Sequence, residues 1–310
     1  MVRVSSSKAV SGYIMALTAA VLWGISGTVA QFLFEQKSIA PDWLVTWRML
    51  IAGIILLSYG FSKAGADIQH IWKKPKDGLE LFLFGAIGMV TVQYTYFYSI
   101  SLSNAATATI LQYVGPVFVV AFYAIKYRRW PTWREYAALV LASVGIFLLV
   151  THGTIESLVI SKDAIIWGIL SALALAFYTI QPVQLLQRFS SNTVTAWGML
   201  IGGVTFALYT QPWYWSGIWD IETYLAVGFI IVFGTVIPFS IFLHSLNLIG
   251  AQTASLLCSV EPLSAAITAV VWLGILFTGM DWLGTILILL TVALLTLKKT
   301  SQTNEPTSHT

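Results

Sequence analysis

Two ionisable residues, Glu261 and Arg48, lie inside long apolar runs of the sequence. Glu261 is about ten residues into the run 251–273, directly before Pro262, and Arg48 is near the start of the run 43–62. A charged side chain at the centre of a membrane costs ~2.5–3.5 kcal/mol on insertion scales, so it usually faces a partner or a polar pathway. Glu261 is therefore predicted to bind a cationic group or to carry a coupling proton. A neutral, hydrogen-bonded structural Glu is the alternative.

Arg48 is predicted to act in gating, and its position leaves several partners open. It can pair with Glu261 or with Asp42, and it can select anionic groups of a ligand. The alternative is that the long side chain snorkels to the membrane interface, where its charge meets water.

Two prolines interrupt the middle of apolar runs. Pro116 and Pro262 have no backbone N–H, so the carbonyls of Gln112 and Cys258 lose their helical hydrogen bonds. A freed carbonyl at membrane depth is tolerated only against protein or a water-filled cavity. Both prolines are therefore predicted hinge or gating residues; a static, packed kink is the alternative.

Amide, hydroxyl and indole side chains in other apolar runs are candidates for ligand contact. A small-molecule site combines an apolar cavity with a few placed polar groups, and aromatic faces also suit flat or cationic ligands. The predicted substrate-binding residues are Trp23, Tyr94, Gln112, Tyr178 and Glu261. Tyrosines near helix ends are often interfacial instead. His244 is interpreted as a structural histidine.

The composition sets the class of protein. Of 310 residues, 57% are hydrophobic and 29 are charged, and the mean hydropathy is +0.81. A soluble domain has about 25% charged residues, so this composition excludes a water-soluble enzyme, a disordered chain and a nucleic-acid binder. The single cysteine excludes an intrachain disulfide framework. The sequence contains no nucleotide-binding loop, metal-ligand spacing or nucleophile elbow, so no cofactor is expected.

Ten apolar runs are long enough to cross a bilayer as helices, which need ~20 residues. They do not show the alternation of a membrane β-barrel. An all-α integral membrane fold is therefore predicted, with ten transmembrane helices at 12–34, 43–62, 79–100, 105–125, 135–151, 164–187, 193–210, 223–246, 251–273 and 281–298.

The distribution of Lys and Arg predicts the orientation of these helices. With both termini in the cytoplasm, the inside segments hold 13 of these residues and the outside segments hold 3. This is a strong positive-inside bias. A multi-pass protein of the plasma membrane is expected, with a cytoplasmic N-terminal segment 1–11 and a disordered C-terminal tail 300–310.

The sequence repeats itself with an offset of 146 residues. Six of the twelve columns from Ala105 to Pro116 are identical to those from Ala251 to Pro262, including a Thr and a Pro. Two homologous halves, 12–151 and 164–298, are therefore predicted, each with five helices. An odd number of crossings inverts the second half relative to the first, and inverted repeats are typical of secondary transporters with a site at the repeat interface.

Three motifs give the chain a family resemblance. They are the Trp23-Gly24 pair in the first helix, Arg48 early in the second, and the small-residue helix with a central proline in the fourth and ninth. In their order and spacing the chain resembles the drug/metabolite transporter superfamily, in its EamA-like ten-helix branch. The resemblance covers 12–298 and implies transport of amino acids, other metabolites or drugs. Ile275 follows the Leu-Gly pair after which the family often has an acidic residue.

The sequence thus predicts a secondary transporter, and not an enzyme, that moves a small metabolite by alternating access between two inverted repeats. Export is expected from the resemblance alone. The expected partners are a small-molecule substrate, the lipid bilayer and a coupling proton or ion, with no nucleic acid, for a monomer or homodimer. A channel for a small solute is the first alternative, and a membrane-embedded enzyme is the second.

Overall fold

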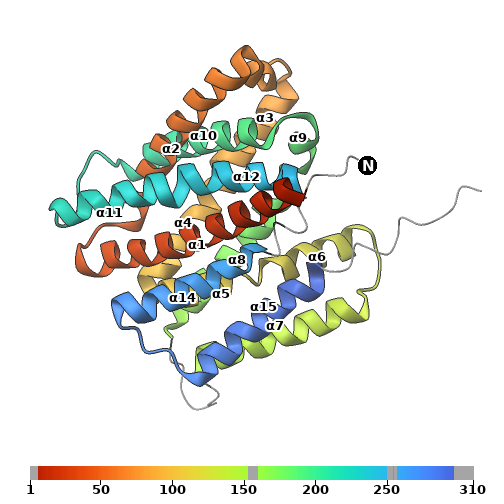
Figure 1. Cartoon of the computed structure of the whole chain (residues 1–310), viewed down its shortest axis with the longest axis vertical. Coiled ribbons are helices and arrows are strands. Elements are labelled where there is room, and N and C mark those ends of the chain that lie inside the picture. Colours follow the sequence, from red (N-terminus) through yellow and green to blue (C-terminus); the bar gives the residue numbers. More distant parts are fainter. Residues whose placement is uncertain (1–5, 153–159, 250–253, 255–256, 297–310) are drawn as a thin grey trace, which may run out of the picture.

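The computed structural model describes residues 6–152, 160–249, 254 and 257–296, and all regular secondary structure in this part of the chain is helical (Figure 1). The elements are α1 Ser6–Gln36, α2 Pro41–Ala64, the 3₁₀ helix η1 Gly65–Trp72, α3 Pro75–Leu83, the π-helix η2 Phe84–Met89, α4 Val90–Leu102, α5 Ala105–Gln112, α6 Gly115–Lys126, α7 Trp133–Thr151, α8 Lys162–Ile180, α9 Val183–Arg188, α10 Ser191–Thr210, α11 Ile221–Ile231, the π-helix η3 Val232–Val236, α12 Ile237–Ile249, α14 Val260–Leu273 and α15 Gly279–Thr296.

The described helices form ten consecutive segments, one for each predicted apolar run. Long segments are built from joined pieces, namely α3–η2–α4, α5–α6, α8–α9 and α11–η3–α12. Seven segments are long and apolar enough to cross a membrane, and α14 and α15 are shorter apolar helices. The predicted all-helical membrane fold is therefore confirmed. α1 already begins at Ser6, within the predicted N-terminal segment, whereas the predicted tail 300–310 lies outside the described residues.

Helices from the two halves of the sequence are interleaved. α1 lies between α12 and α14, α2 packs on α10, α4 packs on α8, and α7 packs on α15 (Figure 1). Each of these contacts joins one helix from the first half of the chain to one from the second. The halves are therefore not two separate bundles, and the surfaces between them run through the centre of the molecule.

Glycines permit the closest of these helix contacts. A Cβ at Gly24 of α1 would lie 2.6 Å from the Glu261 carbonyl oxygen, and one at Gly202 of α10 would lie 2.6 Å from the Gly85 carbonyl oxygen. Small residues let helix backbones approach closely inside membranes, where packing replaces the hydrophobic effect. Gly202 and its neighbour Gly198 thus serve packing within the chain.

The two predicted proline breaks are present. The fourth segment stops at Gln112 and restarts at Gly115 as α6, one residue before Pro116. The ninth segment has a turn at Ser259 before α14 begins. Because proline cannot donate to the preceding turn, both breaks follow from the sequence.

The third and eighth segments contain a second repeated irregularity, a π-helical turn. η2 connects α3 to α4, and η3 connects α11 to α12. Gly88 of η2 and Gly234 of η3 are separated by 146 residues, the same offset as the sequence repeat. Because π-turns kink helices and are frequent at functional sites, each half carries a bend at an equivalent place.

The replacement Gly24→Ala is expected to destabilise the protein, because the new Cβ would lie 1.9 Å from the Ser264 Oγ. Overpacking of this kind costs about 1–3 kcal/mol. Gly228→Ala on α11 is the matched control, since nothing lies within 4 Å of a Cβ there. Thermal unfolding of the purified protein should give a lower midpoint for Gly24→Ala than for Gly228→Ala. Equal midpoints would contradict the close approach of α1 and α14.

Candidate functional site

A cavity of about 240 Å³ lies at the centre of the bundle, between helices from both halves of the chain. Its wall is mostly apolar and aromatic, as in small-molecule sites. The aromatic lining residues are Trp23, Tyr96, Phe97, Tyr178, Phe239 and Phe242, and the charged and amide residues are Arg48, Gln93, Gln112 and Glu261. The cavity therefore brings both ionisable residues that the sequence singles out into one space.

Glu261 lies at the proline break of the ninth segment and is held from the opposite half. The Tyr113 hydroxyl is 3.0 Å from Glu261 Oε2 and 2.6 Å from the Cys258 carbonyl oxygen. This carbonyl is the one that Pro262 frees. The predicted need for a partner is thus met by a tyrosine at the equivalent break of the fourth segment.

Arg48 is buried, with 5% of the residue exposed, and binds the π-turn of the eighth segment. Its Nε donates to Thr235 Oγ1 at 2.6 Å, and its Nη2 donates to the Gly234 carbonyl oxygen at 3.2 Å. The guanidinium also lies 4.8 Å from the ring centre of Phe97. Arg48 therefore does not snorkel to the interface. It makes no direct ion pair with Glu261 or Asp42, all three being described residues.

Several polar atoms on the cavity wall are left without a partner among the described residues. They are Nη1 of Arg48, Oε1 of Glu261 and the side-chain amides of Gln93 and Gln112. Each of these atoms keeps some accessible surface, so it can reach a molecule in the cavity. The cavity thus offers a cationic donor, an anionic acceptor and two amides to a bound molecule.

The structure brings most of the predicted substrate-binding residues together. Trp23 lines the cavity and packs edge-on against Phe239 and Phe242, and Tyr178 stacks on Phe84 of η2. Gln112 and Glu261 line it as well, and so does Arg48, which was predicted for gating. Pro116 and Pro262 lie at the two breaks beside it.

Tyr94 is the predicted binding residue that does not line this cavity. Its ring packs among Tyr98, Trp167 and Phe206, with ring centres 5.3–5.8 Å away. Conversely, the lining residues Phe239 and Phe242 were missed. A phenylalanine in an apolar run carries no signal that separates a cavity wall from a lipid-facing surface.

A second hollow of about 600 Å³ adjoins the cavity, and Leu243 lines both. The hollow is lined by Met15 near the start of α1, Tyr59 near the end of α2, and Asn192 at the start of α10. These helix ends belong to one face of the bundle. His244 also lines this hollow, outside the central cavity.

The chain is similar to known membrane transporters. A model of the EamA-like transporter family matches residues 10–151 and again 162–297. A protein described as an uncharacterized inner membrane transporter, YicL of Salmonella typhimurium (strain LT2), is 42% identical over 287 residues, covering 92% of this chain and 95% of its own. YcbK of Bacillus subtilis (strain 168), described as an uncharacterized transporter, is 24% identical and covers 86% of each chain.

A solved crystal structure shares the fold, with a TM-score of 0.63 at 16% identity, over 92% of this chain and 96% of its own. The family model accounts for almost the whole chain as two repeats of five helical segments. The protein is therefore a multi-pass membrane transporter that belongs to the EamA-like transporter family, within the drug/metabolite transporter superfamily that its motifs resemble.

Proposed function

We propose that the protein is a secondary carrier for a small metabolite, an amino acid, an amine or a drug-like molecule, and that it exposes the central cavity alternately to the two membrane faces. The observation that carries this proposal is a cavity in which the buried Arg48 and the half-buried Glu261 each keep a polar atom without a hydrogen bond. The family resemblance supports export. The description of YicL supports location in the inner membrane.

The orientation belongs to the same proposal. Each repeat has five crossings, so the second repeat, proposed at 164–298, starts from the face opposite to the first, at 12–151. With the positive-inside bias, both termini are cytoplasmic. The end of α1 and the start of α11 then lie on the outer face, and the hollow beside His244 opens toward the cytoplasm.

The charges of the cavity favour a zwitterion as substrate. A carboxylate would bind the free donor of Arg48, an ammonium group would bind the free oxygen of Glu261, and an apolar body would pack on Trp23. Charge-assisted hydrogen bonds of this kind are the strong ones. A small amino acid matches both the charges and the size of the cavity.

Glu261 is also suited to carry a coupling proton. The Tyr113 hydroxyl has one hydrogen but lies near two acceptors, Glu261 Oε2 and the Cys258 carbonyl oxygen. A protonated Glu261 can donate to that hydroxyl, which then donates to Cys258, so all groups are satisfied. An ammonium group entering the cavity would replace this proton, which couples substrate binding to proton release.

Pro116 and Pro262 are proposed as hinges. Each lies at a break in a segment that contributes to the cavity wall, and the Tyr113 hydrogen bond joins the two breaks. Because the repeats are interleaved, whole repeats cannot rock as separate bodies. The moving parts are therefore segments that bend at irregular positions.

Transport assays should show carrier kinetics and depend on the cavity. In proteoliposomes loaded with amino acids, uptake should saturate and show counterflow. Glu261→Gln should weaken apparent affinity about ten- to hundredfold, because a charge-assisted contact contributes about 1.5–3 kcal/mol. Gln112→Ala should weaken it by a smaller factor.

Tyr94→Phe is the control for these variants, because Tyr94 does not line the cavity. It should leave affinity unchanged. Flux that rises linearly with concentration and shows no exchange would favour a channel. Unchanged affinity in both Glu261→Gln and Gln112→Ala would remove these residues from the site.

The hinge proposal predicts coupling between Tyr113 and Pro262 in stability. Tyr113→Phe leaves the buried Cys258 carbonyl without a partner, which costs about 1–3 kcal/mol. In a Pro262→Ala background the N–H restored at position 262 can bind this carbonyl, so Tyr113→Phe should cost less there. Thermal unfolding of the four proteins in this double-mutant cycle measures the difference. An equal cost in both backgrounds would contradict the role of Tyr113.

A further inference from the structure

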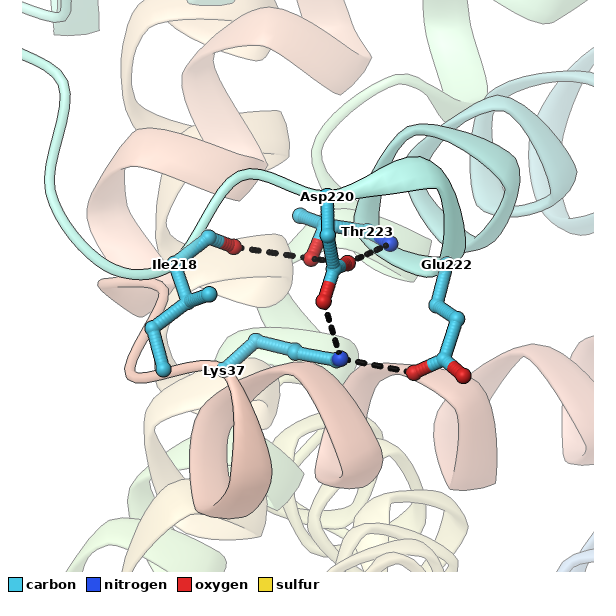
Figure 2. A network of polar contacts seen from close by, with 5 residues as sticks. All are labelled: Lys37, Ile218, Asp220, Glu222 and Thr223. Atoms are coloured by element: carbon cyan, nitrogen blue, oxygen red, sulfur yellow. Dashed lines mark hydrogen bonds and ion pairs between the residues drawn. The ribbon is translucent and has the colours of Figure 1, made fainter.

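Two clusters of ion pairs join the repeats, and they lie at opposite ends of the bundle. Lys37, directly after α1, binds Asp220 and Glu222 at the start of α11 (Figure 2). Arg188, the last residue of α9, binds Asp77 and Glu80 of α3. Figure 1 shows α11 and α9 at opposite ends of the molecule. Consecutive segments cross in opposite directions, so the end of the first segment and the end of the sixth lie on opposite membrane faces. The Lys37 cluster and the Arg188 cluster therefore lie on opposite faces as well.

The two clusters have the same design. In each, a cation at the end of the first segment of one repeat binds two carboxylates at the start of the third segment of the other repeat. Asp77 and Asp220 are thus at near-equivalent positions of the two repeats. A surface ion pair formed by chance would have no reason to recur in this relation.

The Lys37 cluster is part of a wider contact between the end of α1 and the loop before α11. Lys37 Nζ lies 2.6 Å from both Asp220 Oδ2 and Glu222 Oε2, and its carbonyl oxygen accepts a hydrogen bond from the Ile218 N–H at 2.8 Å. Gly217 makes this close approach possible, since a Cβ there would lie 2.4 Å from the same carbonyl oxygen. The loop before α11 is thereby held against the end of α1.

Each cluster is connected to the cavity through a π-turn. α3 carries the carboxylates that bind Arg188 and continues through η2 into α4, which lines the cavity. α11 carries those that bind Lys37 and continues through η3 into α12. Arg48 binds the carbonyl oxygen of Gly234 inside η3, so a cavity residue contacts the bend directly.

We propose that the two clusters are the latches of the transport cycle, and that α3 and α11 are gate segments that bend at η2 and η3 when their latch opens. This inference rests on the proposed carrier function and identifies Lys37 and Arg188 as positioning residues that never touch the substrate. One latch must hold while the other is open, because a carrier that opened both would leak.

The strength of the pairs suits a latch. Lys37 has only 11% of its side chain exposed, but its partners Asp220 and Glu222 have 40% and 66% exposed. Water can therefore solvate both carboxylates when the pairs separate, and pairs with such exposed partners are weak enough to break during each cycle. Asp77, by contrast, has 5% of its side chain exposed. Removing Arg188 alone would leave this buried carboxylate without a cation. Disrupting the Arg188 cluster therefore costs more free energy than disrupting the Lys37 cluster.

Protonation does not open the Lys37 latch near neutral pH. The hydrogen bond from Lys37 lowers the pKa of Asp220 to about 2, and the hydrogen bond to Asp220 raises the pKa of Lys37 above its ordinary value. The stabilisation that ionised Asp220 gives the latch is present above pH ~3.9 and is lost as the pH falls toward 2. The stabilisation that protonated Lys37 gives is present below pH ~10.4 and is lost as the pH rises beyond that value. Between these pH limits both groups stay charged, so the latch opens when the end of α1 and the start of α11 move apart.

Cysteine labelling tests the latches without a known substrate. The reporter is Ser26→Cys on the cavity wall, in a Cys258→Ala background, and the probe is a membrane-impermeant charged maleimide. Lys37→Met should raise labelling about three- to fivefold from one side of the membrane only, since an ion pair whose carboxylates are exposed is worth up to about one kcal/mol. Labelling of intact cells measures access from the outer face of the membrane, and labelling of inverted vesicles measures access from the cytoplasmic face.

The opposite latch should act on the opposite side. Arg188→Met combined with Asp77→Asn avoids a stranded carboxylate and should raise labelling from the other side. Lys162→Met and Lys74→Met are the matched controls. Each is an exposed lysine on the face of its latch that makes no ion pair with another described residue. Lys37→Arg, which keeps the charge, should label like the parent.

The latch proposal would be overturned if the latch variants labelled like their controls. It would also be overturned if Lys37→Met and the Arg188→Met, Asp77→Asn variant both gained labelling from the same side. Counterflow of amino acids in the parent is measured separately. A parent that exchanges substrate while its latch variants label normally refutes the latches and leaves the carrier function standing. A parent that shows no counterflow refutes the carrier function, whatever the labelling.

Discussion

Hydrocarbon offers no hydrogen-bond partners, and this constraint organises the centre of the protein. Polar groups that a proline or a π-turn frees there need other partners, and in two cases the partner comes from the other repeat. Tyr113 of the first repeat binds the Cys258 carbonyl of the second, and Arg48 of the first binds the Gly234 carbonyl. The contacts that satisfy these groups also hold the repeats around the cavity.

In the proposed carrier, the irregular positions have two roles. A regular helix would be more stable in lipid but could neither bend nor present polar atoms to a substrate. The chain confines its irregularity to equivalent places in each repeat, at the proline breaks and at η2 and η3. Interleaving of the repeats makes segment bending, and not the rocking of two separate bodies, the motion that the packing favours.

The sequence predicted the helices and much of the cavity, for identifiable reasons. Length and hydropathy define membrane segments because the bilayer fixes both. Charges inside apolar runs and mid-helix prolines are rare enough to stand out, as Glu261 and Pro262 do. The sequence could not separate Tyr94 from Gln112, since the rotation of a helix depends on its neighbours. The π-turns and the partners of Lys37 and Arg188 depend on contacts between distant segments, which one sequence does not reveal.

Distances between spin labels at the two faces test the central claim most directly, namely that opposite ends of the bundle open alternately. One pair, Gln36 and Tyr224, reports the end that holds Lys37; the other, Leu79 and Gln187, reports the end that holds Arg188. Double electron–electron resonance in proteoliposomes should show the two distances changing in opposite directions when a substrate that exchanges in counterflow is added. Distances that lengthen together, or that stay constant while substrate exchanges, would contradict the account.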